Sequence, residues 1–96
     1  MIDFDGVLRE VNEPYRDMMF HNADNAIKEM RRKGYQVYIF STRAAHGNEQ
    51  FIHDWLEENN IEVDGVTGLK LDANYYIDDK AIRFSGDWAE TMRHIA

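Results

Sequence analysis

The sequence predicts an α/β fold, specifically a three-layer, Rossmann-like parallel sheet of about four to five strands with helices on both faces. Short apolar runs alternate along the chain with segments whose apolar residues recur at helical spacing, which is typical of β-α-β units. Parallel β-α-β connections are right-handed, so few arrangements of such a sheet are open. Polar residues directly follow several of the predicted strands, which indicates that one edge of the sheet carries a functional site.

Length and composition favour one soluble domain, and we expect residues 1–96 to form it. The chain is 44% apolar and 12% aromatic, which is too much for a disordered protein. No apolar run approaches the roughly 20 residues that span a bilayer. No signal-peptide pattern precedes the first predicted strand, so we expect a cytoplasmic protein without membrane contact.

Cysteine content and charge exclude several classes of function. The chain has no cysteine, which excludes a disulfide framework, a zinc–thiolate site and a thiol nucleophile. Eleven Lys and Arg residues stand against eighteen Asp and Glu residues, giving a net charge of −7. Such a protein repels polyanions, so nucleic-acid binding is disfavoured.

The first half of the chain predicts a strand, a loop, a helix and a second strand. Residues 1–4 are typical of the end of a short strand. Residues 7–21 hold the only proline and are expected to form a loop or a partly helical flap. Asn22 is a candidate N-cap for a helix over 23–33, whose last turn is basic. The continuous apolar run at 37–40 predicts a buried parallel strand.

The second half continues the alternation of helices and strands. The expected elements are a helix between Asn48 and Asn59, a strand over 61–66, a loop over 68–74, a strand over 75–77, a short edge strand over 82–84 and a last helix over 88–95. Trp55 and Trp88 lie on apolar stripes of the two helices, so we predict that both are in the core. Tyr75 and Tyr76 are expected to pack within their strand.

Acidic residues gather at the ends of two predicted strands. Asp3 and Asp5 follow the first strand, and Asp78 and Asp79 follow the fourth. Clustered carboxylates raise one another's pKa unless a cation joins them. Mg²⁺ is the natural cation because it prefers a few hard oxygen ligands and keeps some of its own waters. We therefore predict a Mg²⁺ site whose candidate ligands are Asp3, Asp5, Asp78 and Asp79.

A hydroxyl and a lysine complete a pattern suited to phosphate. Ser41 ends the second predicted strand and Lys70 lies in the following loop, so both can approach the same sheet edge. Phosphoryl transfer needs charge neutralisation, positioning and a nucleophile, and a carboxylate can serve as that nucleophile. Thr42 and Arg43 are further candidates for substrate contact, although a salt bridge explains Arg43 equally well. Taken alone, Ser41 is a turn cap and Lys70 a surface residue.

Four segments together resemble the motifs of the haloacid dehalogenase-like hydrolases. Residues 3–7 (DFDGV) are similar to the first motif, and residues 38–43 (YIFSTR) are similar to the second, a strand ending in Ser or Thr. Lys70 lies where the lysine of the third motif is expected, and residues 76–79 (YIDD) are similar to the fourth. All four occur in family order, each at or near a strand end, and they span residues 3–79.

The resemblance implies a Mg²⁺-dependent phosphomonoesterase that works through an aspartyl-phosphate. Asp3 would attack phosphorus and place a carboxylate oxygen on the metal. Asp5 would protonate the leaving group, and it would then deprotonate the water that cleaves the intermediate. In the family the backbone carbonyl of the residue at Asp5 is also a metal ligand.

The other motif residues would hold the phosphoryl group and the metal. The resemblance implies that Ser41 hydrogen-bonds a phosphoryl oxygen and that Lys70 neutralises the phosphoryl group and holds the nucleophile. Asp78 would bind Mg²⁺ directly. Asp79 would bind it through water or pair with Lys70.

Members of this family often carry a cap domain, and none is expected here. The intervals from Asp5 to Ser41 and from Ser41 to Lys70 each hold one helix and its connections. An uncapped site admits bulky phosphoesters, or it is closed by residues 7–21 or by a second subunit of a homo-oligomer. Only two residues precede Asp3, so the first strand is expected to be short, with the α-ammonium within reach of that carboxylate.

Other functions stay open at this point. The main alternative is a catalytically weak or inactive member that binds a phosphorylated ligand or a partner protein. A phosphatase acting on polynucleotide ends is disfavoured by the acidity of the chain. Receiver-like phosphoacceptor domains use similar residues, but there the paired acids come first, so the order of motifs does not match.

Overall fold

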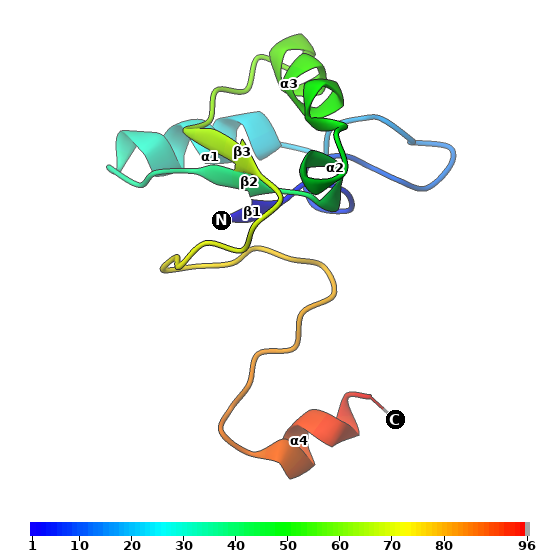
Figure 1. Cartoon of the computed structure of the whole chain (residues 1–96), viewed down its shortest axis with the longest axis vertical. Helices are drawn as coiled ribbons and strands as arrows, with labels where there is room; N and C mark the ends of the chain where they lie inside the picture. Colours follow the sequence, from blue (N-terminus) through cyan, green and yellow to red (C-terminus); the bar gives the residue numbers. More distant parts are fainter. Residues whose placement is uncertain (96) are drawn as a thin grey trace.

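The computed structural model describes residues 1–95 and confirms an α/β chain with a parallel sheet (Figure 1). Its elements are, in chain order, β1 (Ile2–Asp3), α1 (Ala23–Arg32), β2 (Tyr38–Phe40), α2 (Thr42–Ala45), α3 (Glu49–Glu58), β3 (Gly65–Thr67) and α4 (Trp88–Arg93). None of the helices in these residues has the length and apolar character that a membrane crossing requires.

The sheet has three parallel strands in the order β1-β2-β3, fewer than the four to five that the sequence predicts. Ile2 lies opposite Ile39, and Ile39 lies opposite Val66. The predicted fourth strand is reduced to a bridge between Ile2 and Ile77 on the free side of β1. Backbone N–H groups support this bridge, since Asp3 donates to the Ile77 carbonyl and Ile77 to the Met1 carbonyl, both at 2.9 Å.

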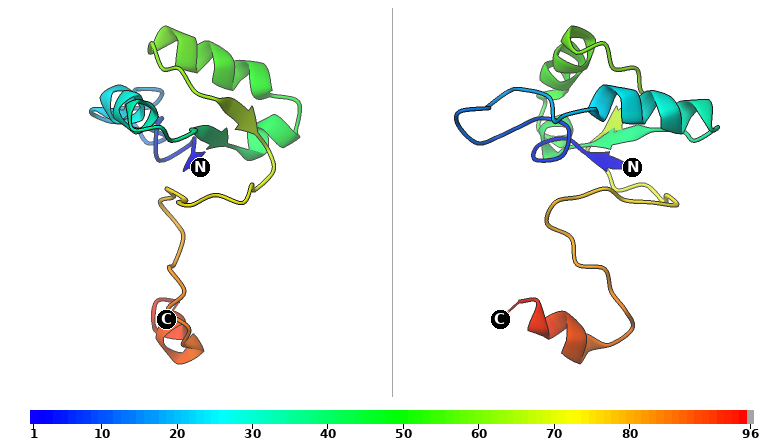
Figure 2. Two further views of the ribbon diagram at one scale, coloured as in Figure 1. Left: turned by 90° about the vertical axis from the view of Figure 1, so that its left-hand side faces the viewer. Right: turned by 180° about the vertical axis from the view of Figure 1, so that it is seen from behind.

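One face of the sheet carries the core. Helices α1 and α3 lie on the same side of the strands (Figure 2). Ile27 of α1 and Ile52 of α3 belong to the same buried cluster as Ile39 of the central strand. Tyr38 and Phe40 point to the opposite face and are only half-buried. The described residues therefore form a two-layer body, with the second helical layer of the sequence prediction unformed.

The predicted helices agree closely with α1 and α3. Their apolar stripes pack into the core, and each begins one residue after the expected cap, Asn22 or Asn48. Neither asparagine side chain makes a capping hydrogen bond, so the stripes rather than the caps determine these helices. The short helix α2 was not predicted. Ser41 caps it by accepting a hydrogen bond from the Arg43 N–H at 3.1 Å.

The C-terminal arm, residues 80–95, projects from the body and ends in α4 (Figure 1). The predicted edge strand over 82–84 does not form there. The prediction that Trp88 lies in the core is wrong, because its exposed fraction is 70% and its ring packs beside that of Phe84, which is itself exposed. By contrast, Trp55 is buried as predicted. The radius of gyration of 14.6 Å reflects the arm; a compact chain of this length has about 12.5 Å.

Candidate functional site

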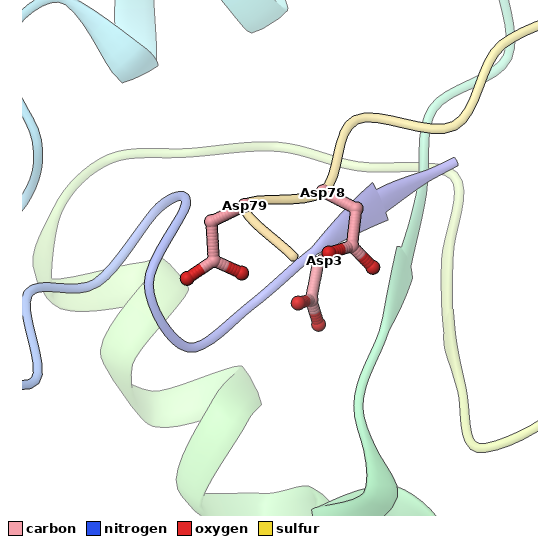
Figure 3. Close-up of side chains that lie close together, drawn as sticks. All are labelled: Asp3, Asp78 and Asp79. Carbon is pink, nitrogen blue, oxygen red and sulfur yellow. The ribbon is translucent and has the colours of Figure 1, made fainter. Parts of the chain in front are cut away.

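Three aspartates meet beyond the end of β1 and form what we call the carboxylate triad: Asp3, Asp78 and Asp79 (Figure 3). Each offers a carboxylate oxygen within 4.8 Å of those of the other two. Asp3 is the last residue of β1, and the other two follow Ile77, whose carbonyl accepts the Asp3 N–H. The bridge beside β1 therefore brings together acids that are 75 positions apart in the sequence (Asp3 to Asp78).

Burial and acidic neighbours disfavour the charged form of the Asp3 carboxyl. Partial burial raises the pKa of the Asp3 carboxyl, and the negative charge of Asp78 raises it further, with smaller contributions from Asp79 and Asp5. The Phe4 N–H, 3.0 Å from Oδ1 of Asp3, opposes this shift by donating a hydrogen bond to the carboxylate. Three carboxylates with little protein charge to balance them are a donor set that suits Mg²⁺, a hard cation.

Asp5, the fourth predicted ligand, does not join the triad. Its Oδ1 lies 2.7 Å from a guanidinium nitrogen of Arg9, and its Oδ2 lies 2.9 Å from Nε of Arg43. Arg9 is itself buried and pairs with Asp17, and the guanidinium groups of both Arg9 and Arg43 lie over the Phe51 ring. Both oxygens of the carboxylate that was expected to bind metal and to transfer protons are thus paired with guanidinium groups.

Gly6 allows the turn after β1 to approach the triad closely. Its φ of +85° is one that residues with a β-carbon rarely adopt. The turn is held by the Phe4 carbonyl, which accepts hydrogen bonds from the N–H groups of Leu8 and Arg9 at 3.0 and 3.1 Å. A β-carbon at Gly6 would lie 2.5 Å from Oδ2 of Asp79, so a larger residue there would require the Asp79 carboxylate to shift.

Ser41 and Thr42 lie at the carboxyl end of β2, next to the triad's strand. Phe40 is opposite Asp3 in the sheet, so Ser41 follows one position beyond the triad's first carboxylate. The Ser41 hydroxyl is buried and accepts a hydrogen bond from the Arg43 N–H, which leaves its own proton free to donate. Thr42 is the first residue of α2. The turn-capping interpretation of Ser41 is therefore correct locally, and its hydroxyl still has a proton for a ligand.

Lys70 contacts a tyrosine ring and makes no ion pair with the triad. Its Nζ is 4.7 Å from the centre of the Tyr76 ring, and no ion pair in residues 1–95 includes it. Tyr75 and Tyr76 are exposed rather than packed within a strand. The Met1 ammonium, expected near Asp3, instead donates a hydrogen bond to the Tyr75 carbonyl at 2.9 Å.

Arg9 pairs with both Asp5 and Asp17, and the sequence pattern did not predict this residue as part of the site. Its spacing of four positions after Asp5 was a weak signal, since such spacing brings side chains together only in a helix or a tight turn. The Phe51 ring of α3 lies against the guanidinium groups of Arg9 and Arg43, a contact that helical spacing alone does not predict.

Comparisons with known proteins identify no relative of this chain. No family model matches it, no curated protein matches it, and no solved structure matches its fold. The function is therefore inferred from the arrangement of the site and from the sequence motifs.

Proposed function

We propose that the chain is a Mg²⁺-dependent phosphomonoesterase of the haloacid dehalogenase type that acts through an aspartyl-phosphate intermediate. The observation that carries the proposal is the convergence of Asp3, Asp78 and Asp79 within 4.8 Å at the carboxyl end of β1. Parallel sheets bind their ligands at that edge. The order of the four sequence motifs supports the same assignment.

The triad would hold the metal, and Asp3 would also be the nucleophile. Bound Mg²⁺ would neutralise charge on the triad and on the phosphoryl group. A carboxylate oxygen of Asp3 would form a bond to phosphorus as the ester oxygen leaves, taking a proton from Asp5. Asp5 would then accept a proton from the water that attacks the aspartyl-phosphate, which releases inorganic phosphate and restores Asp3.

The surrounding polar residues would position the phosphoryl group. Ser41, whose hydroxyl has a free proton, would donate to a phosphoryl oxygen, with Thr42 and Arg43 beside it on α2. Lys70 would neutralise the phosphoryl group after leaving the ring of Tyr76. We also propose that residues 75–77 form a fourth strand beside β1 and that the second face of the sheet is covered, without a cap domain. The uncapped site would take a phosphorylated small molecule in the cytoplasm.

Hydrolysis of an aryl phosphate tests this function directly. We expect the wild-type chain to release phosphate with added Mg²⁺ and to stop when the metal is chelated. The variant Asp3→Asn should lose at least about 1,000-fold in turnover because it lacks the nucleophile. The matched control is Asp24→Asn, a half-buried aspartate in the first turn of α1 that lies outside the triad. Undiminished turnover in Asp3→Asn would exclude the proposed mechanism.

The alternative is a binding domain without turnover, and one observation favours it. Both oxygens of Asp5, the residue assigned to proton transfer, are paired with Arg9 and Arg43. In that arrangement neither oxygen is free to carry a proton. Calorimetric binding of Mg²⁺ and inorganic phosphate, with no hydrolysis of any ester in a phosphate panel, would favour the binding domain over the enzyme.

A further inference from the structure

The side chain of Tyr76 connects the loop after β3 to the segment that carries two of the triad's aspartates. Its hydroxyl donates a hydrogen bond to the Leu71 carbonyl and accepts one from the Ala73 N–H at 3.0 Å. Its ring lies against the Lys70 ammonium, with Nζ 4.7 Å from the ring centre. Tyr76 precedes Asp78 by two positions, so one side chain contacts three residues of the loop from beside the candidate metal site.

The Tyr76 hydroxyl supplies the hydrogen bonds of the loop backbone around Lys70. Oγ1 of Thr67 accepts the Leu69 N–H at 3.0 Å, which fixes the start of the loop. Beyond that point, within the part of the chain that the structure describes, the backbone of residues 70–74 makes hydrogen bonds only to the Tyr76 hydroxyl. The segment that carries Lys70 is therefore tied to Tyr76 and not to the sheet.

The strand register places the Tyr76 ring next to the triad. Ile2 lies opposite Ile77. Pairing along parallel strands advances one residue at a time, so Asp3 lies opposite Asp78. Side chains alternate along an extended segment, so Tyr76 and Asp78 project from the same face. Two residues of extended chain span about 7 Å, so the ring and the Asp78 side chain are neighbours on that face.

The position of Lys70 over the ring leaves the carboxylates free for a metal. An ammonium among three carboxylates would compete with Mg²⁺ for them. Exposed cation–π contacts and exposed ion pairs stabilise by similar small amounts, so a restrained loop is enough to select between them. The flexible four-carbon stem of lysine can still carry the ammonium from the Tyr76 ring to its neighbour on the same face.

We propose that Tyr76 is a positioning residue that keeps the Lys70 ammonium beside the triad, but out of it, until a phosphoryl group binds. While the ammonium lies over the ring, Mg²⁺ meets no competing cation at the carboxylates. A phosphoryl group at the metal adds negative charge, which attracts the ammonium away from the ring. This role rests on the proposed function, because it sets the order in which metal, phosphate and lysine meet at the same site.

Calorimetric Mg²⁺ titration of three variants tests the first part of this role. Tyr76→Leu frees the lysine to pair with the carboxylates, so it should weaken Mg²⁺ binding about two- to fivefold, which corresponds to one exposed ion pair. The double variant Tyr76→Leu/Lys70→Met lacks the ammonium and should bind Mg²⁺ at least as tightly as the wild type. Tyr75→Leu is the matched control, because Tyr75 is also exposed and its ring packs edge-to-face on Tyr35 instead. It should keep the wild-type affinity.

Three results of the titration would overturn the proposal. Equal Mg²⁺ affinity in Tyr76→Leu and the wild type would show that the ring does not keep the lysine away from the carboxylates. A loss of affinity that Lys70→Met does not restore would show that Tyr76 has only a structural role. A wild type that binds no Mg²⁺ would overturn the role of Tyr76 together with the metal site.

Proton NMR of the lysine tests the second part. The ring current of Tyr76 should move the ε-methylene resonance of Lys70 upfield, and Tyr76→Leu should lose this shift. We expect the shift to persist with Mg²⁺ alone and to be lost when inorganic phosphate is added with Mg²⁺. A shift that persists with both present would overturn the proposed movement of the lysine. None of these readouts uses ester hydrolysis, so a chain that binds Mg²⁺ and phosphate without turnover would contradict the enzyme and not the role of Tyr76.

Discussion

Gly6 and Asp79 lie close together at the candidate site: a β-carbon built on Gly6 would lie 2.5 Å from Oδ2 of Asp79. The turn after β1 therefore fits against the third carboxylate without room for a methyl group. This close approach links the conformation of a loop to the geometry of the triad, and it makes the glycine a sensitive probe of metal binding.

Gly6→Ala should weaken Mg²⁺ binding as well as stability. The positive φ alone costs about 1–2 kcal/mol for a residue with a β-carbon, and the collision would displace the Asp79 carboxylate from the triad. Urea unfolding and calorimetric Mg²⁺ titration measure the two effects separately.

Gly34→Ala is the matched control for that variant. Gly34 has a φ of +95°, but a β-carbon added there would have no atom of residues 1–95 within 4 Å. We expect a similar loss of stability with unchanged Mg²⁺ affinity. Equal weakening of Mg²⁺ binding in both variants would show that the contact with Asp79 is unimportant.

The stability of the chain should depend on pH through Asp3. Its pKa is raised in the folded state above the ordinary value of 3.8, chiefly by burial and then by Asp78. The folded state therefore holds the Asp3 proton more tightly than the unfolded state does. As pH rises from 3.8 through the folded pKa, the wild type loses stability, and below that window the penalty is absent.

Asp3→Asn removes this titration, so it should be more stable than the wild type at neutral pH in a chelator. The difference should disappear below the pH window. Urea midpoints collected from about pH 3 to about pH 7 measure it. A constant difference across the whole range would contradict the assigned shift.

Mg²⁺ should stabilise the folded chain through the triad. At a concentration ten times the dissociation constant, a cation that binds only the folded state adds about 1.4 kcal/mol to the free energy of unfolding. Asp78→Asn should abolish most of this gain, whereas Asp54→Asn, on the exposed face of α3, should keep it. Thermal unfolding at constant ionic strength separates specific binding from screening; equal gains in both variants would argue against the triad.

The two tryptophans should differ sharply in their contribution to stability. Trp55 is 5% exposed, packs edge-to-face on Phe4 at 5.2 Å and donates from Nε1 to the Asp17 carbonyl at 2.9 Å. Trp55→Ala should cost about 3–5 kcal/mol. Trp88→Ala, at a 70% exposed position, should change stability by less than about 0.5 kcal/mol. Comparable losses in denaturant unfolding would indicate that the arm packs on the body.

Local patterns were sufficient to predict much of this fold. The apolar stripes of α1 and α3 recur at helical spacing because one face of each helix must enter the core, and both helices form where expected. The run at 37–40 predicts β2 because a central parallel strand is apolar along its length. Grouping acids by strand ends predicts that Asp3, Asp78 and Asp79 lie together, and in the structure they do.

The remaining features depend on contacts that no local pattern contains. The stripe of α4 predicts burial, yet in the structure the helix lies away from any partner surface. Asp5 looks like a metal ligand by its spacing from Asp3, but the fold brings Arg9 and Arg43 to its two oxygens. Lys70 lies over the ring of Tyr76, whose hydroxyl also hydrogen-bonds the backbone of the same loop, and strand spacing predicts neither contact.

The double pairing of Asp5 has a kinetic consequence for the proposed enzyme. While Arg9 and Arg43 both pair with the Asp5 carboxylate, these ion pairs join the loop after β1 to α2. Before Asp5 could transfer a proton, one of its two ion pairs would have to break, most simply by Arg43 turning towards the incoming phosphate. Because side-chain rearrangements of this kind take only nanoseconds, the pairing would not limit the rate of turnover; it would lower the fraction of molecules whose Asp5 is able to transfer a proton.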